Sequence, residues 1–171
     1  MQRNPTLGRL CEVVVETSAR ADVFDTVYAA HYASLIRLAY VTIGSMPAAE
    51  DVVQDVFVEW YRRIEHVDSP AAYLRRSVVF RCSSWIRRRV LERRHAGTFD
   101  QPAVVPPDPR AVAVRAALAR VAPRYRMALF LRYYLDLSVA EVAETLDCPL
   151  GTAKSLLHRG LALMQEHLED R

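Results

Sequence analysis

The fold is decided by residues 138–159, which read SVAEVAETLDCPLGTAKSLLHR. Ser138 is a suitable N-cap, and Glu141 stands at the capping-box position three residues later. Apolar residues then recur at helical spacing up to Leu146 and predict a short amphipathic helix. Asp147 follows where a tight turn needs a left-handed residue, a conformation that Asp tolerates. Because a second helix begins near Pro149, the segment has helix-turn-helix spacing.

The second helix of this segment presents a polar face in its first turns. Recognition helices of helix-turn-helix proteins read the major groove with these turns. The residues placed there are Thr152, Lys154, Ser155, His158 and Arg159. The helical wheel predicts an inward face of Leu150, Ala153, Leu157, Leu161, Met164 and Leu168. It turns Leu156 and Leu163 outward, where they would suit a thymine methyl or a docking surface for a regulator.

A proline-rich stretch precedes the helix-turn-helix. Residues 97–110 hold four of the nine prolines in the chain. Proline fixes φ and removes an amide donor, so this stretch is expected to be an extended, semi-stiff linker. Helices are expected after it, around 111–120 and 124–135. The linker therefore separates an N-terminal module from a C-terminal one.

The N-terminal module is also predicted to be helical. We expect one helix over 23–43 that ends at Gly44, and a second that begins near Pro47. The second helix is expected to have an acidic outer face and an apolar stripe that buries Ala49, Val52, Val53, Val56, Phe57, Trp60 and Ile64. His31 lies within the apolar stripe of the first helix and is interpreted as a core histidine. A third helix is expected over about 70–94. Its inward face would hold Leu74, Val78, Cys82 and Trp85.

These elements predict an all-α fold with two small helical domains, 21–96 and 111–171, joined by the extended proline-rich linker. Residues 1–20 stay unassigned, because their pattern fits a short extra helix, a regulatory tail or a disordered segment.

The charge is distributed very unevenly along the chain. Residues 1–69 carry six basic and ten acidic side chains, whereas 70–95 carry eight arginines against Glu92 alone. Arg offers a planar fork suited to phosphate and base contacts. The outer face of the third helix combines arginines with aromatic rings, so it is a candidate surface for nucleic acid. Its residues are Tyr73, Arg76, Ser77, Phe80, Arg81, Ser84, Arg87 and Arg88.

Other classes of function lack their sequence signatures. The apolar run 10–15 is short and contains Glu12, so no secretory signal or membrane span is expected, and the protein is expected in the cytoplasm. Cys11, Cys82 and Cys148 have no CxxC spacing that would predict a disulfide framework or a zinc site. No glycine-rich phosphate loop occurs, and the five histidines form no triad with cysteines or carboxylates. We therefore expect no cofactor, no metal and no enzyme activity.

The order of the segments resembles the extracytoplasmic-function (ECF) group of bacterial RNA polymerase sigma factors. Residues 49–57, which read AEDVVQDVF, are similar to region 2.2 of that family, 73–89 to regions 2.3 and 2.4, and 137–159 to region 4.2. The resemblance extends from Phe24 to Leu168. It implies an alternative sigma factor that binds core polymerase, recognises two promoter elements and stabilises promoter opening.

The resemblance also implies roles for particular residues. Region 2.2 docks on the β′ clamp helices of core polymerase, with the β flap as a second polymerase contact. The outward residues implied in clamp binding are Asp51, Gln54 and Asp55. Regions 2.3 and 2.4 hold the minus-ten element open, and the loop 64–72 helps to capture a flipped base. The residues implied in this step are Tyr73, Arg76, Phe80, Arg81, Ser84, Arg87 and Arg88.

Region 4.2 would read the minus-thirty-five element with the polar face that contains Thr152, Lys154, Ser155, His158 and Arg159. The linker would run toward the active-site channel of the polymerase. Promoter DNA, both double- and single-stranded, is thus an implied partner. The resemblance also admits an anti-sigma factor as a partner.

The chain departs from the family pattern at several positions. Phe80 stands where many members have asparagine, so stacking on a base would replace hydrogen bonding. Leu156 and Leu161 replace frequent basic residues, which predicts a weaker grip on DNA, and Asp147 replaces the usual turn glycine.

Two rival functions stay open at this point. A sigma-like adaptor would bind polymerase or an anti-sigma factor without reading promoters. A helix-turn-helix repressor would need a palindromic operator and would not need the acidic outer face of the second helix.

Overall fold

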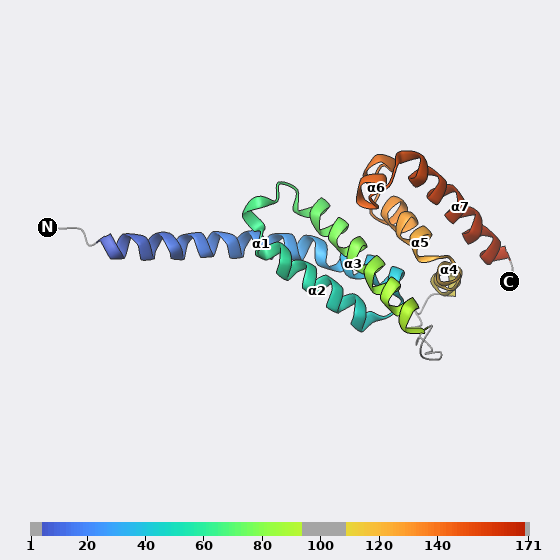
Figure 1. Ribbon diagram of the computed structural model, residues 1–171, viewed down its shortest axis with the longest axis horizontal. Coiled ribbons are helices and arrows are strands. Elements are labelled where there is room, and N and C mark those ends of the chain that lie inside the picture. Colours follow the sequence, from blue (N-terminus) through green and yellow to red (C-terminus); the bar gives the residue numbers. More distant parts are fainter. Residues whose placement is uncertain (1–4, 94–108, 170–171) are drawn as a thin grey trace.

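A computed structural model of the chain describes residues 5–93 and 109–169, and all regular structure within them is helical. Two groups of helices result, as Figure 1 shows. The first group contains α1 (Pro5–Ile43), α2 (Met46–Tyr61), the 3-10 turn η1 (Ile64–His66) and α3 (Pro70–Arg93). The second contains α4 (Pro109–Arg120), α5 (Pro123–Leu129), the π-helical turn η2 (Phe130–Tyr134), α6 (Val139–Thr145) and α7 (Leu150–Glu169). The predicted all-α fold is confirmed.

Helix α1 is much longer than the helix predicted over 23–43. Pro5 suits a first helical turn, and no proline interrupts the chain between it and Ile43, so the helix continues through the segment that the sequence left unassigned. Its end was predicted correctly. Gly44 has a φ of 83° and donates its N–H to the carbonyl oxygen of Tyr40 at 2.7 Å. The first turns of α1 extend away from the other helices (Figure 1).

The core of the first group forms where α2 packs on α1 and α3. Trp60 is fully buried, and its ring stacks on Phe24 of α1 with centroids 5.9 Å apart, while Phe57 meets both rings edge-on. These contacts fix the rotation of α2 about its axis. The buried residues of α2 are six of the seven that were predicted: Ala49, Val52, Val53, Val56, Phe57 and Trp60. The seventh, Ile64, is half-buried in η1.

Helix α3 packs largely as predicted, although the predicted inward residue Trp85 is only half-buried against the core. Leu74, Val78 and Cys82 are fully buried, and Val79 is buried beside them although the sequence did not place it inward. Burial raises the pKa of the Cys82 thiol to about 12. His31 is half-buried between this bundle and solvent, and desolvation, followed by the charge of Arg75, lowers its pKa.

The second group is held together by a close approach of α5 and α7. Gly160 is buried at their crossing, where a Cβ would lie 3.2 Å from the side chain of Leu129. A larger residue at position 160 would require the Leu129 side chain to shift by a few tenths of an ångström, so the glycine permits the close approach of these helices.

The two groups pack against each other and do not stand apart. One continuous hydrophobic core runs through both, with α1 against α5 and α3 against α6. Residues 97–108 of the predicted linker, 97–110, lie outside the described residues. Its last two residues form the start of α4. Pro109 suits that first turn. None of the helices within the described ranges is long and apolar enough to cross a membrane.

Candidate nucleic-acid interface

The outer face of α2 is acidic and open to solvent. Pro47 lies in the first turn of the helix, and the buried stripe turns Asp51, Gln54 and Asp55 away from the core. All three are exposed, and the exposed Val58 lies one turn further on. The three residues predicted to bind polymerase therefore share one accessible surface.

Arg81 joins this acidic surface to α3. Its guanidinium lies 3.0 Å from Oδ2 of Asp55 and 2.9 Å from Oε2 of Glu59, so one side chain pairs with two carboxylates of α2. The hydrogen bond from Arg81 lowers the pKa of Glu59. The sequence predicted Arg81 as a DNA contact, but in this structure two of its donors are paired with carboxylates of α2. Neither the pairing nor the role of Glu59 was predicted.

The outer face of α3 carries the remaining predicted DNA contacts. Phe80 is 67% exposed, and Arg76, Arg87 and Arg88 are also exposed. Tyr73, Ser77 and Ser84 are half-buried on the same face. Within the described residues, Arg87 and Arg88 have no carboxylate partner, and Arg87 donates to Ser84 Oγ at 2.9 Å. These two guanidinium groups are thus available to an external anion.

Arg76, in contrast, is paired with the second group of helices. Its Nη2 lies 3.1 Å from Oδ1 of Asp147, the residue in the turn between α6 and α7. Beside this pair, the faces of α2 and α3 and the ends of α5 and α6 enclose a groove of about 1530 Å³. Tyr73 and Phe80 line one side, and Met127 and Leu146 line the other.

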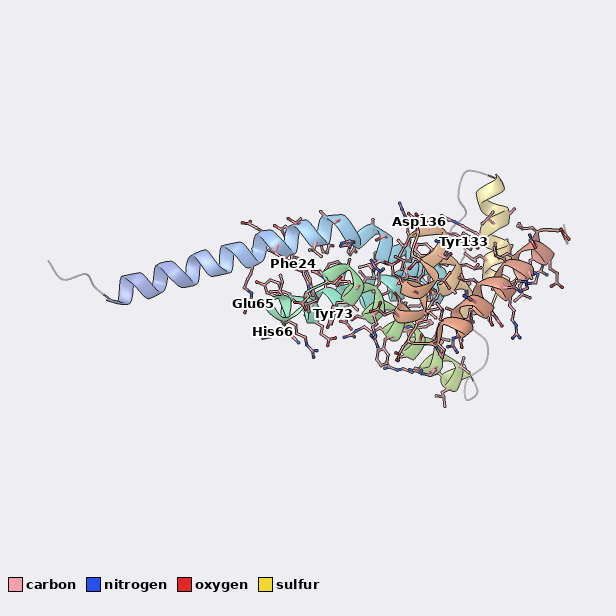
Figure 2. The ribbon with its side chains drawn as sticks, turned by 90° about the horizontal axis from the view of Figure 1, so that it is seen from above. Phe24, Glu65, His66, Tyr73, Tyr133 and Asp136 are labelled. Carbon is pink, nitrogen blue, oxygen red and sulfur yellow. The ribbon has the colours of Figure 1, made fainter. Side chains whose placement is uncertain are left out.

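The loop 64–72, which was predicted to help capture a base, lies at one end of the first group of helices. Figure 2 shows Phe24, Glu65, His66 and Tyr73 at this end, whereas Tyr133 and Asp136 lie in the other group of helices. Glu65 of η1 pairs with Arg20 of α1 at 3.1 Å, so the loop is tied to the bundle. The exposed His66 is a polar group that the sequence did not single out.

The helix-turn-helix is built as predicted at its start and at its turn. Ser138 Oγ accepts from the N–H of Glu141 at 3.2 Å, and Glu141 Oε2 accepts from the N–H of Ser138 at 2.8 Å. This capping box begins α6. Asp147 has a φ of 50°, the left-handed conformation that the turn requires. Local interactions at the start of α6 and in the turn after it therefore orient α6 and α7 relative to each other.

The first turns of α7 expose a polar surface. Lys154, Ser155, His158 and Arg159 are exposed, while Thr152 is half-buried. Ser155 donates to the carbonyl oxygen of Gly151 at 2.9 Å, which leaves its oxygen free to accept a hydrogen bond. All five residues predicted to read DNA lie on α7, four of them fully accessible.

The predicted inward face of α7 was partly wrong. Leu156 is buried and Leu163 is half-buried, so neither offers the outward apolar contact suggested by the wheel. The close approach at Gly160 rotates the helix so that its own buried residues are Ala153, Leu156, Leu157 and Gly160. Three leucines assigned to the interior are instead exposed: Leu150, Leu161 and Leu168.

The π-helical turn η2, where the predicted helix 124–135 changes from α to π geometry, was not predicted. Its Tyr133 and Tyr134 are exposed. Arg37 of α1 donates to the hydroxyl of Tyr134 and lies over its ring at 5.6 Å.

Two protein-family models match separate parts of the chain. The model described as Sigma-70 region 2 matches residues 27–91, and the one described as Sigma-70, region 4 matches residues 111–164. These ranges fall on the two groups of helices.

Curated relatives match most of the chain. The RNA polymerase sigma-E factor of Streptomyces avermitilis is 34% identical over 146 residues, which cover 81% of this chain and 80% of that protein. The ECF RNA polymerase sigma factor SigW of Bacillus subtilis is 25% identical over 169 residues, covering 87% of this chain and 90% of that protein.

Solved structures share the arrangement of helices. A chain of the co-crystal structure of the sigma factor RpoE with the anti-sigma factor NepR from Bartonella quintana matches with a TM-score of 0.76 at 23% identity, covering 86% of this chain and 98% of that chain. The structure of CnrH in complex with the cytosolic domain of CnrY matches with a TM-score of 0.65 at 19% identity, covering 92% and 96%. At these identities the two structures establish the fold alone.

Proposed function

Since this chain belongs to the ECF group of the sigma-70 family of RNA polymerase sigma factors, and is thus an alternative sigma factor that directs promoter recognition by RNA polymerase, we propose a division of work between its two helical groups. Residues 21–96 bind core polymerase and the minus-ten element. Residues 111–171 bind the minus-thirty-five element, and 97–110 link the two. The observation that carries this proposal is the adjacency of an exposed acidic face on α2 and an exposed arginine-aromatic face on α3.

The acidic face of α2 is the polymerase-binding surface. Asp51, Gln54 and Asp55 offer acceptors to the β′ clamp helices, while the second group of helices meets the β flap. Arg81 holds Asp55 and Glu59 in place through its two ion pairs. Its part in DNA binding is then secondary, because a phosphate would have to displace two carboxylates.

The outer face of α3 holds the minus-ten element open. Unstacking a base costs a few kcal/mol, and stacking on an aromatic ring returns about 1–3 kcal/mol per base, so Tyr73 and Phe80 offset much of the cost. Arg87 and Arg88 contact phosphates, with Arg76, Arg81 and Ser84 on the same face. Promoter opening in this mechanism is binding of the single strand and needs no catalytic residue, metal or cofactor. We therefore propose that the protein is not an enzyme and acts in the cytoplasm, with the polymerase.

The polar surface of α7 reads the duplex of the minus-thirty-five element. Lys154 and Arg159 supply charge, and Thr152, Ser155 and His158 supply shorter donors and acceptors for base edges and phosphates. Both forms of promoter DNA, single- and double-stranded, are thus partners. An anti-sigma factor is a further proposed partner, since the sigma factor RpoE, which shares this fold, was solved in complex with the anti-sigma factor NepR.

Run-off transcription with purified core polymerase tests the proposal. We expect start-site-specific transcripts only when the chain is added. We expect the triple variant Asp51→Ala/Gln54→Ala/Asp55→Ala to bind core polymerase at least tenfold more weakly, because truncating even one hot-spot residue of an interface costs about 2 kcal/mol or more. Core affinity is measured by titrating a fluorescent chain. Glu50→Ala, which removes an exposed charge from the same helix, is the control and should bind normally.

Two outcomes would favour the rival functions. Core binding without a transcript on any promoter, including promoters selected from the genome, would indicate an adaptor. Binding to duplex DNA without binding to core would indicate a repressor.

Phe80 gives a separate test of base stacking. Its exposed ring has no role in the core, so Phe80→Ala should fold normally and lower the permanganate reactivity of opened thymines by about tenfold, within the range for loss of one stacked base. Phe80→Tyr keeps the ring and should open promoters nearly as well as the wild type. Equal reactivity of the alanine variant and the wild type would remove Phe80 from the mechanism.

A further inference from the structure

Arg20 of α1 contacts the chain on both sides of the step from α2 into η1. Its Nη2 donates to the carbonyl oxygen of Tyr61, the last residue of α2, at 3.3 Å. Its Nη1 lies 3.1 Å from Oε1 of Glu65 in η1. The guanidinium also lies over the ring of Tyr61, 5.6 Å from its centroid. One side chain of α1 thus makes three contacts where the loop 64–72 begins.

The other polar contacts of residues 61–66 are local. The N–H of Arg63 donates to the carbonyl oxygen of Trp60 at 2.8 Å, and the N–H of His66 donates to that of Arg63 at 2.9 Å. The side chain of Arg63 pairs with Glu59, one turn earlier, at 3.4 Å. Among the described residues, Arg20 is therefore the side chain that makes a polar contact with this segment from another helix.

Apolar packing holds the loop on the bundle but does not orient its polar side chains. Ile64 and Val67 are half-buried against the core, whereas Glu65 and His66 between them are exposed. Burial of apolar surface has no preferred direction, while hydrogen bonds to a planar guanidinium require a particular geometry. The contacts of Arg20 therefore set the direction in which the exposed part of the loop faces.

Arg20 is itself held in place by the helix on which it lies. Phe24, one turn further along α1, meets the ring of Tyr61 edge-on at 5.4 Å and stacks on the buried Trp60. The Arg20 side chain is 35% exposed, and its Nε is buried. The guanidinium is thus pre-organised to hold the loop. Arg20 also lies before residues 27–91, which match the region 2 model, so that match gives it no role.

We propose that Arg20 is a positioning residue for recognition of the minus-ten element, and that it holds the loop 64–72 in the orientation that captures a flipped base. This inference rests on the proposed function, because it takes residues 21–96 as the minus-ten module. Arg20 acts through the loop, since its donors face Tyr61 and Glu65. The selectivity of base capture then depends on a part of α1 that precedes that module.

Arg20→Ala tests the proposal, and Arg37→Ala is its matched control. Arg37 is an arginine of the same helix that also lies 5.6 Å from a tyrosine ring, but its contacts are with Tyr134 in the second group of helices. Both substitutions leave the buried core intact, so both variants should fold. Arg20→Lys keeps a charge beside Glu65 but lacks the planar fork that reaches the Tyr61 carbonyl as well, so its effects should be intermediate.

Amide hydrogen exchange of the free chain, followed by NMR, reports the order of the loop without DNA or polymerase. In Arg20→Ala the amides of Arg63 and His66 should exchange about three- to tenfold faster than in the wild type, the range expected for loss of one exposed ion pair and one hydrogen bond. Amides in the middle of α2 should be unchanged, and Arg37→Ala should match the wild type at all of these positions.

An abasic scan of the minus-ten strand reports base capture. Single-stranded oligonucleotides are taken from a promoter on which the chain directs transcription, each base is replaced in turn by an abasic site, and binding to the chain assembled with core polymerase is measured. Loss of a captured base should weaken wild-type binding about fivefold or more. Arg20→Ala should reduce this penalty about three- to tenfold at one position and leave the penalties at other positions unchanged.

Equal exchange of the loop amides in Arg20→Ala and the wild type would overturn the inference, whether or not the chain directs transcription. Faster exchange with an unchanged abasic profile, or with a uniform loss at every position, would overturn the role of Arg20 in base capture. Failure of the proposed function is distinguishable, because it would appear as no start-site-specific transcript from the wild type with core polymerase.

Discussion

Open complexes formed by Arg87→Ala/Arg88→Ala should be about 10²-fold fewer than those formed by the wild type on the same promoter. Both guanidinium groups are exposed at one end of α3, and no carboxylate among the described residues pairs with them. A hydrogen bond to a charged group contributes about 1.5–3 kcal/mol, and about 1.4 kcal/mol corresponds to a tenfold change. The yield is measured by permanganate footprinting and by run-off transcription.

The salt dependence gives an independent readout of the same contacts. Each phosphate contact to a single strand contributes about 0.7 to the slope of log affinity against log salt, so the double variant should lose about 1.4 from that slope. Arg89→Ala is the control, because Arg89 is engaged with Glu92 and with the ring of Trp85 on the same helix. An unchanged slope in the double variant, or an equal loss in the control, would show that Arg87 and Arg88 do not contact phosphate.

Trp60→Ala should lower the free energy of unfolding of the first bundle by about 3–5 kcal/mol. Trp60 has no exposed surface and contacts Phe24 and Phe57, and removing a large buried aromatic side chain leaves a cavity that its neighbours fill only in part. Domains are stable by only about 5–15 kcal/mol, so the melting temperature should fall by more than 10 °C. Urea unfolding followed by circular dichroism at 222 nm measures the change.

Trp60→Phe separates packing from polarity at this site. The indole Nε1 is buried and has no hydrogen-bond partner among the described residues, so its removal relieves an unpaired donor while most of the ring volume remains. We expect a loss under about 1.5 kcal/mol. A loss as large as that of Trp60→Ala would mean that the indole makes an interaction that packing does not explain.

Local signals in the sequence predicted the parts of the fold that depend on neighbouring residues. The capping box of Ser138 and Glu141 and the left-handed Asp147 were predicted because each is satisfied within a few residues. The stripe of α2 was also clear, since its apolar residues occupy one narrow face.

The sequence could not predict features that depend on tertiary packing. Apolar residues occur on several sides of α7, so periodicity left its rotation open until the contact of Gly160 with Leu129 selected the face that contains Leu156. The partners of Arg76 and Arg81 were unpredictable for a related reason. Their arrangement on α3 identified exposed guanidinium groups but not the carboxylates that other helices bring to them.

Because Cys82 is buried, its rate of reaction with a thiol reagent reports local opening of the first group of helices. Thiolates are the reactive form of cysteine, and burial raises the pKa of the Cys82 thiol and so disfavours its thiolate. Because the side chain is also inaccessible, a thiol reagent modifies it only during moments when α3 detaches from α1 and α2. The labelling rate of Cys82 therefore reports how often α3 detaches from the rest of the first group of helices.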